Sequence, residues 1–159
     1  MGDDSTQPPR PMGNILNAAR DGQLGIQMSA EDFIYIDRDC EYFKIAIRSI
    51  QRSMDIVSRQ SHWGLGEGNG DMVSAQTLVD RFKKKARGAE DRNSVHQIME
   101  DHYRIVEDIQ EVHRVVRDRI MQVDSDFAAD FNRLNTSLPE RPPVGVQFAP
   151  PSLPIGPNE

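Results

Sequence analysis

Residues 29–58 read SAEDFIYIDRDCEYFKIAIRSIQRSMDIVS. Its large apolar residues recur at alternating spacings of three and four, at Phe33, Ile36, Cys40, Phe43, Ile47, Ile50, Met54 and Val57. That alternation is typical of a coiled-coil seam, in which one stripe of a helix packs along a neighbour. Ser29 and Asp32 form a capping-box pattern at the start. The sequence therefore predicts a helix over about 29–61.

This helix needs a second element along its seam. About thirty residues at ~1.5 Å each make a rod of roughly 45 Å, which is too long to be stable alone in water. The charged residues between the seam positions are expected on a solvated face: Asp37, Arg38, Asp39, Glu41, Lys44, Arg48, Arg52 and Asp55.

A second long helix is predicted over 94–135. Ser94 and Gln97 form another capping pattern. An apolar stripe follows at helical spacing, through Val95, Ile98, Met99, His102, Ile105, Val106, Ile109, Val112, His113, Val116, Ile120, Val123 and Phe127. It is wider than the first stripe, as expected of a helix with two neighbours. The expected fold is all-α, an antiparallel hairpin of two long helices.

Proline placement marks the ends of this domain. All ten prolines lie at positions 8, 9, 11, 139, 142, 143, 150, 151, 154 and 157, so that residues 12–138 contain none. Because proline interrupts helices, the middle of the chain is free to be helical and the ends are not. We expect the helical domain over 29–135, a disordered tail over 1–28 and a proline-rich disordered tail over 136–159.

The two long helices are joined through a glycine-rich turn and a short inserted helix. Residues 62–70, HWGLGEGNG, hold the only tryptophan and glycines that permit a reversal of the chain. A helix over about 71–87 follows, with Gly88 near its end. Its basic run comprises Arg81, Lys83, Lys84, Lys85 and Arg87. A solvated face that stabilises the helix end is the favoured interpretation, and an acidic partner or nucleic acid is the alternative.

A tryptophan at the turn of a helical hairpin resembles the Trp-x-Gly family of type VII secretion substrates and partners from Gram-positive bacteria. In this chain Gly64 and Gly66 lie one and three positions after Trp63, and the inserted segment 67–93 makes it an extended relative. The resemblance covers about residues 29–135. It implies a hairpin that pairs as a homodimer or heterodimer into a four-helix bundle. It also implies secretion, or display at the cell surface, without a cleaved signal peptide.

The same resemblance implies an export signal, a tyrosine with an acidic residue four positions later. Tyr103 and Glu107 match this pattern and are the candidate export signal, while Tyr35 and Asp39 match it on the first helix. A surface or seam-edge pair is the alternative interpretation of Tyr103 and Glu107. The residues expected to form the pairing seam are Phe33, Ile36, Phe43, Ile47, Ile50, Met54, Val57, Val106, Ile109, Val116 and Ile120.

Composition and motifs disfavour several other classes of protein. The net charge of -6 disfavours a general nucleic-acid binder, and no apolar run reaches the ~20 residues that a membrane span needs. The four histidines, His62, His96, His102 and His113, form no recognisable metal motif. No cofactor, metal or catalytic group is predicted, and Cys40 is expected to pack as a small apolar residue. The preferred function is a non-enzymatic pairing hairpin of type VII secretion. The alternatives are a cytoplasmic adaptor, chaperone or immunity-like coiled coil, and a metal-binding helical-bundle enzyme.

Overall fold

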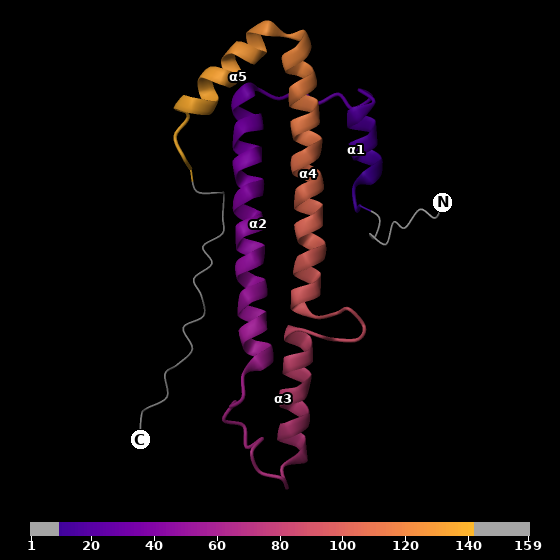
Figure 1. Cartoon of the computed structure of the whole chain (residues 1–159), viewed down its shortest axis with the longest axis vertical. Helices are drawn as coiled ribbons and strands as arrows, with labels where there is room; N and C mark the ends of the chain where they lie inside the picture. The colour runs from indigo at the N-terminus through magenta and orange to yellow at the C-terminus, as the bar shows by residue number, and fades with distance from the viewer. Residues whose placement is uncertain (1–9, 142–159) are drawn as a thin grey trace, which may run out of the picture.

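The computed structural model describes residues 10–141, which contain five helices and no strand. The helices are α1 (Gly13–Arg20), α2 (Ala30–Arg59), α3 (Val73–Ala86), α4 (Val95–Val123) and α5 (Ser125–Ser137). Helices α2 and α4 lie side by side and antiparallel, and α3 continues the rod of α4 beyond its first residue (Figure 1). The predicted all-α hairpin of two long helices is confirmed.

Local sequence signals explain where the helices begin and end. The Ser29 hydroxyl accepts a hydrogen bond from the Asp32 backbone N–H at 3.2 Å, and the Asp32 carboxylate accepts one from the Ser29 N–H at 3.0 Å. Ser94 caps α4 by accepting from the Gln97 N–H at 3.4 Å. Gly88, at a φ of +92°, follows the end of α3 in the left-handed conformation that glycine tolerates best.

The single helix predicted over 94–135 is in fact two helices. The Asp124 carboxylate accepts hydrogen bonds from the N–H groups of Asp126 and Phe127, at 3.1 and 2.9 Å, and so starts α5 in a new direction. Helix α5 then folds back over the first turns of α2 (Figure 1). The ring of Phe127 meets that of Phe33 edge to face, with centroids 5.9 Å apart.

The expectation of a tail over 1–28 is wrong for the described residues 10–28. They form α1, which packs on α4, and a linker that leads to α2. Leu16 and Ala19 are each only 1% exposed because α1 turns them onto α4, whereas Ile15 remains 42% exposed. Eight residues are too few for a periodic pattern to stand out in the sequence. Residues 1–9 lie outside the described part.

The expected tail over 136–159 is likewise wrong at its start. Helix α5 runs to Ser137, and the following residues lie against α2. The Tyr35 hydroxyl donates to the Pro139 carbonyl at 3.3 Å, and the Arg38 guanidinium donates to the Leu138 carbonyl at 3.2 Å. Residues 142–159 are outside the described residues.

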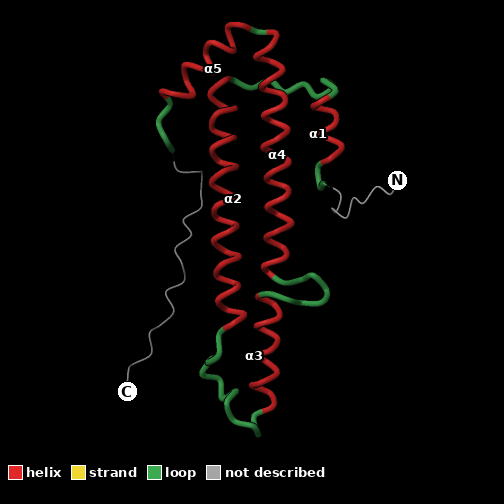
Figure 2. The backbone as a smooth tube through the Cα atoms, in the orientation of Figure 1, coloured by secondary structure: helices red, strands yellow, loops and turns green. Residues whose placement is uncertain are grey.

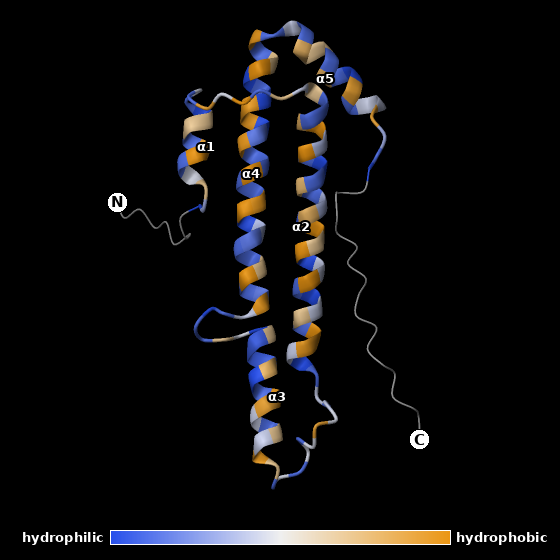
Figure 3. Ribbon diagram, turned by 180° about the vertical axis from the view of Figure 1, so that it is seen from behind, coloured by the Kyte–Doolittle hydropathy of each residue, from blue (hydrophilic) through white to orange (hydrophobic). Residues whose placement is uncertain are grey.

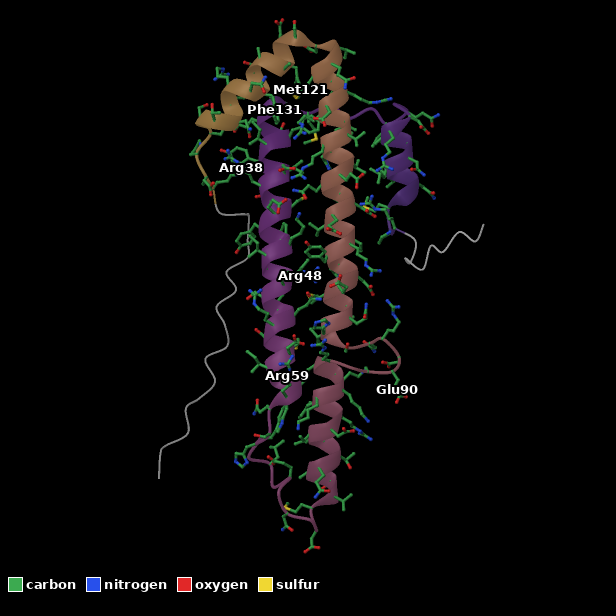
Figure 4. All side chains as sticks on the ribbon, viewed as in Figure 1. Arg38, Arg48, Arg59, Glu90, Met121 and Phe131 are labelled. Atoms are coloured by element: carbon green, nitrogen blue, oxygen red, sulfur yellow. The ribbon has the colours of Figure 1, made fainter. Side chains whose placement is uncertain are left out.

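The hydrophobic core is concentrated at the end of the hairpin where α1, α2, α4 and α5 meet. Its buried members are Leu16, Ala19, Ala30, Phe33, Ile34, Val112, Val116 and Phe131. Met121 and Phe131 are close together there, under the fold-back of α5 (Figure 4). At the opposite end the chain runs through two loops, residues 60–72 and 87–94, that flank α3 (Figure 2).

Candidate pairing surface

The line along which α2 and α4 touch is largely polar. The Arg114 guanidinium binds Asp37 at 2.5 Å, the Lys44 ammonium donates to the Gln110 side-chain oxygen at 2.8 Å, and Arg48 binds Glu100 at 2.5 Å. We call this set the polar ladder: Asp37, Glu41, Lys44, Arg48 and Gln51 on α2 with Glu100, Gln110 and Arg114 on α4. Arg48 points from α2 toward α4 in Figure 4.

The buried polar atoms of the polar ladder all have hydrogen-bonding partners. Gln51, only 4% exposed, donates to Glu100 at 3.0 Å and to the His96 carbonyl at 3.1 Å. Its amide, together with Arg48, holds the pKa of Glu100 below the ordinary value. The pKa of Glu41 is lowered by hydrogen bonds from Lys44 and Gln110. Among the described residues, no buried side-chain nitrogen or oxygen lacks a partner.

The expected solvated face therefore needs correction. Asp37, Lys44 and Arg48 were assigned to it from their charge, but they contact α4 and are half-buried. Glu41 also contacts α4, but it is exposed as expected. Long side chains pack their aliphatic stems between two helices while their charged ends find partners, so charge alone does not place such residues in solvent. The Lys44 side chain is only 15% exposed.

Most of the predicted apolar seam on α2 lies one residue before these polar contacts, although Cys40 and Ile47 within it are buried. From Ile36 to Met54, each seam residue is followed directly in the sequence by a residue that contacts α4, the first being Asp37 and the last Asp55. On α4 the apolar stripe shows the same offset, since Met99 precedes Glu100 and His113 precedes Arg114. Neighbouring side chains point about 100° apart around a helix axis. Because the two helices are antiparallel, an offset of one residue toward the N-terminus on each of them points both apolar stripes to the same side of the hairpin.

Contacts at the core end support this geometry, because the rings of Phe33 and His113 meet at 6.3 Å. Nearer the turn, the two stripes form one surface without an Asp, Glu, Lys or Arg residue, which we call the uncharged face. Its members are Phe43, Ala46, Ile47, Ile50, Ser53, Met54 and Val57 on α2 with Val95, Ile98, Met99, His102, Ile105, Val106 and Ile109 on α4. Figure 3 shows that apolar segments continue along both helices toward the turn.

The predicted seam residues range from buried to exposed. Phe33, Ile47 and Val116 are buried, as is Cys40 between them on α2. Phe43 exposes 37% of its surface, and Ile105, which belongs to the predicted apolar stripe beside the seam, exposes 36%. The others are half-buried: Ile36, Ile50, Met54, Val57, Val106, Ile109 and Ile120. The hairpin therefore leaves much of the uncharged face open within one chain.

The chain reverses at the glycine-rich turn, as predicted. Gly64 and Gly66 adopt positive φ angles of +69° and +87°. The Glu67 carboxylate accepts hydrogen bonds from the N–H groups of Trp63, at 2.5 Å, and Leu65, at 2.9 Å. These bonds lower the pKa of Glu67 to about 2. Sequence reasoning missed this organising role, although an acid among glycines is a reasonable signal for it.

The Trp63 indole packs on α3. It stacks on the Phe82 ring, with centroids 5.8 Å apart and planes 17° from parallel, and its N–H donates to the Gln60 carbonyl at 3.1 Å. Trp63 is half-buried by this arrangement. The turn motif therefore fixes the position of α3 against the end of α2.

The two candidate export signals differ in accessibility. Tyr103 is half-buried because its ring lies under the Arg48 guanidinium, whereas Glu107 is exposed. Tyr35 is only 6% exposed, with its hydroxyl bonded to Pro139. The pair on α4 is thus the more accessible of the two.

Sequence reasoning also missed a buried carboxylate that anchors α1. The Asp108 side chain, 2% exposed, accepts from the Arg10 guanidinium at 2.6 Å and from the Met12 N–H at 2.9 Å. Arg10 and Arg20 both pair with Glu111 beside it, and the hydrogen bond from Arg10 lowers the pKa of Glu111. No local signal distinguishes Asp108 from its acidic neighbours Glu107 and Glu111 in the sequence.

The remaining candidates for chemistry have structural partners. The Nδ1 atoms of His102 and His113 lie 2.8 and 2.7 Å from the carbonyl oxygens of Ile98 and Ile109, one turn earlier. Burial raises the pKa of the Cys40 thiol to about 11, so the reactive thiolate is disfavoured. Within residues 10–141, no three histidine, cysteine or acidic residues are grouped to hold a metal ion.

The helices of the described part include none with the length and hydropathy of a membrane span. No protein-family model matches the chain, and neither does any curated protein or solved structure.

Proposed function

We propose that this protein is a non-enzymatic helical hairpin that pairs through its uncharged face with a second copy or a related hairpin, and that it is a type VII secretion substrate or partner. The observation that carries the pairing is the open uncharged face itself. Phe43, Ile98 and Ile105 remain more than a third exposed on one side of a hairpin whose own contact line is polar. Exposed apolar surface of this kind marks interaction sites.

The shape of the face favours a helical partner. It follows α2 from Phe43 to Val57, which at ~1.5 Å per residue is roughly 20 Å of helix. Two antiparallel helices with apolar stripes turned to the same side present half of a four-helix bundle. Helix α1 occupies the next stretch of the same α4 stripe, where Leu16 lies in one core with Val112 and Val116. An amphipathic helix is thus an occupant that this stripe already accepts.

The secretion part of the proposal rests on the resemblance in the turn and on the candidate signal. Trp63 and the glycines at 64 and 66 lie at the reversal between α2 and α3, and Glu107 is exposed on α4. On this proposal the protein leaves the cell, or reaches its surface, without a cleaved signal peptide.

The proposal is tested by tagging the chain in its native host and isolating it from both lysate and culture filtrate. We expect a second hairpin, identical or related, to be recovered with it, and we expect the chain itself in the filtrate only when the export ATPase is present. Phe43→Asp and Ile105→Asp should abolish the pairing. Ile45→Asp is the matched control, because Ile45 is 65% exposed on α2 and lies outside the uncharged face.

Two outcomes would contradict the proposal. Recovery only from lysate, in complex with an unrelated enzyme, would favour a cytoplasmic adaptor or chaperone. Equal loss of the partner with Ile45→Asp would show that the uncharged face is not the contact surface.

A further inference from the structure

A hollow between α3 and the loop of residues 87–94 lies apart from the uncharged face. It has a volume of about 580 Å³, and we call it the tip hollow. Its lining combines apolar, basic and acidic residues: Leu78, Arg81, Phe82, Lys84, Lys85, Ala89, Glu90 and Asp91. The loop that forms one wall bulges out from the rod of α3 and α4, with Glu90 on it (Figure 4).

The apolar part of the tip hollow is accessible and firmly placed. Leu78 and Phe82 expose 42% and 45% of their surface. Stacking on Trp63 restricts the Phe82 ring, while Ala75 and Val79 on the same helix are buried. A rigid aromatic ring with one accessible side offers contact area at little cost in conformational entropy.

The charged part of the hollow is positive in a chain that is negative overall. Its lining holds Arg81, Lys84 and Lys85 against Glu90 and Asp91, a net charge of +1, whereas the whole chain has a net charge of -6. Lys84 pairs with Asp80 at 2.9 Å and Lys85 with Asp91 at 3.7 Å. Arg81 has no carboxylate partner among the described residues, so its guanidinium is available to a ligand.

We infer that the tip hollow binds an acidic linear segment of another protein, through a large apolar side chain placed on Leu78 and Phe82 and a carboxylate placed on Arg81. The exposed Leu78 and Phe82 favour a large apolar side chain of the ligand, and the Arg81 guanidinium, unpaired within the described residues, favours a carboxylate. Glu90 and Asp91 on the opposite wall repel a phosphate backbone that passes through the hollow, whereas a short segment places its carboxylate at Arg81 and keeps it away from that wall.

The test uses the full-length protein and a synthetic peptide that carries one Leu-Phe pair flanked by acidic residues. Trp63 is the only tryptophan and stacks on Phe82, so its emission reports directly on occupancy of the hollow. We expect saturable binding with a change in Trp63 emission, and weakening as salt is raised. Titrating a fluorescein-labelled copy of the peptide by anisotropy gives the affinity independently.

Arg81→Glu should weaken peptide binding by about fivefold or more, because it replaces an attraction with a repulsion. Arg52→Glu is the matched control, since Arg52 is exposed on α2 away from the hollow. Leu78→Gln should also weaken binding. It leaves the stack of Trp63 on Phe82 in place, and circular dichroism of each variant confirms that α3 is still folded.

The inference is overturned if an acidic peptide without the Leu-Phe pair binds equally well, or if Arg52→Glu weakens binding as much as Arg81→Glu. Tighter binding of single-stranded oligothymidine than of the peptide would identify a polyanion site instead. Phe43→Asp should leave peptide binding unchanged, so failure of the tip hollow and failure of the pairing proposal are distinguishable.

Discussion

The guanidinium carbon of Arg48 lies 3.8 Å from the centroid of the Tyr103 ring. This contact joins α2 to the first third of α4, and it places the candidate export tyrosine beside the polar ladder. A change at Tyr103 therefore alters the hairpin as well as any signal that the tyrosine carries.

Tyr103→Ala should lower the free energy of unfolding by about 1 kcal/mol, because it removes the cation–π contact with Arg48. Tyr103→Phe should retain most of the stabilisation from this contact. Glu107→Gln should leave the free energy of unfolding unchanged, since Glu107 is exposed. Chemical denaturation of the three variants measures this. Secretion is then compared between Glu107→Gln and the parent chain. Unimpaired export of Glu107→Gln would exclude Glu107 from the signal.

Ile47→Asp should cost about 3 kcal/mol of stability, because it places an unpaired carboxylate at a position that is 8% exposed. Ile45→Asp, two residues away and largely exposed, should change stability by less than about 0.5 kcal/mol. Thermal and urea unfolding followed by circular dichroism provide the comparison. Equal midpoints for the two variants would mean that Ile47 is not buried in solution.

The polar ladder predicts a non-additive pair of substitutions. Gln110→Leu should cost about 1–2 kcal/mol, because Lys44 and Glu41 each lose a hydrogen-bonding partner. Adding Lys44→Leu should restore part of that loss, since two apolar side chains then pack against each other and Glu41 keeps Arg114 as its partner. A double-mutant cycle from urea denaturation measures the coupling. Additive losses would show that Lys44 and Gln110 do not interact.

The turn should resist acid. The pKa of Glu67 is lowered from its ordinary 4.5 to about 2, and the hydrogen bond from the Trp63 N–H is the largest cause. The carboxylate therefore stabilises the folded turn fully at pH values above 4.5. This stabilisation is lost as the pH falls through about 2. Trp63 emission should therefore stay native at pH 3. Glu67→Gln should perturb the emission already at neutral pH. An emission change centred near pH 4.5 in the parent chain would contradict the hydrogen bonding described for Glu67.

The anchor of α1 is tested by Asp108→Asn. The amide retains the shape of the carboxylate but loses its charge-assisted bond to Arg10, and we expect a loss of about 1–2 kcal/mol that is confined to α1. Hydrogen exchange should quicken in Gly13–Arg20 while α5 keeps its protection. Faster exchange in α5 as well would show that Asp108 supports the entire core instead.

The elements that the sequence predicted well are those with a strong local signal. The apolar spacing from Phe33 to Val57 and the cap at Ser29 placed α2 to within two residues at each end. The break at Asp124 was missed because the apolar spacing continues through Phe127, although an aspartate in a capping position was there to be read. Which face of each helix meets the other depends on the partner's side chains. Their charge therefore predicted that Lys44 and Arg48 lie in solvent, whereas their partners on α4 hold them between the helices.

The candidate site was predictable to a similar degree. Trp63 and its glycines pointed to the reversal, but the stack on Phe82 joins residues 19 positions apart across a turn whose shape the sequence does not specify. Asp108 was overlooked because its partners, Arg10 and Met12, lie almost a hundred residues away.

Close packing is distributed unevenly along the length of the molecule. Phe33, Val112 and Phe131 share one cluster with α1, whereas the burial around α3 rests on a few small side chains such as Ala75 and Ala86. Local opening of α3 therefore breaks few contacts and stops where that cluster begins. The buried cluster at the other end keeps α1, α2, α4 and α5 packed together when α3 opens.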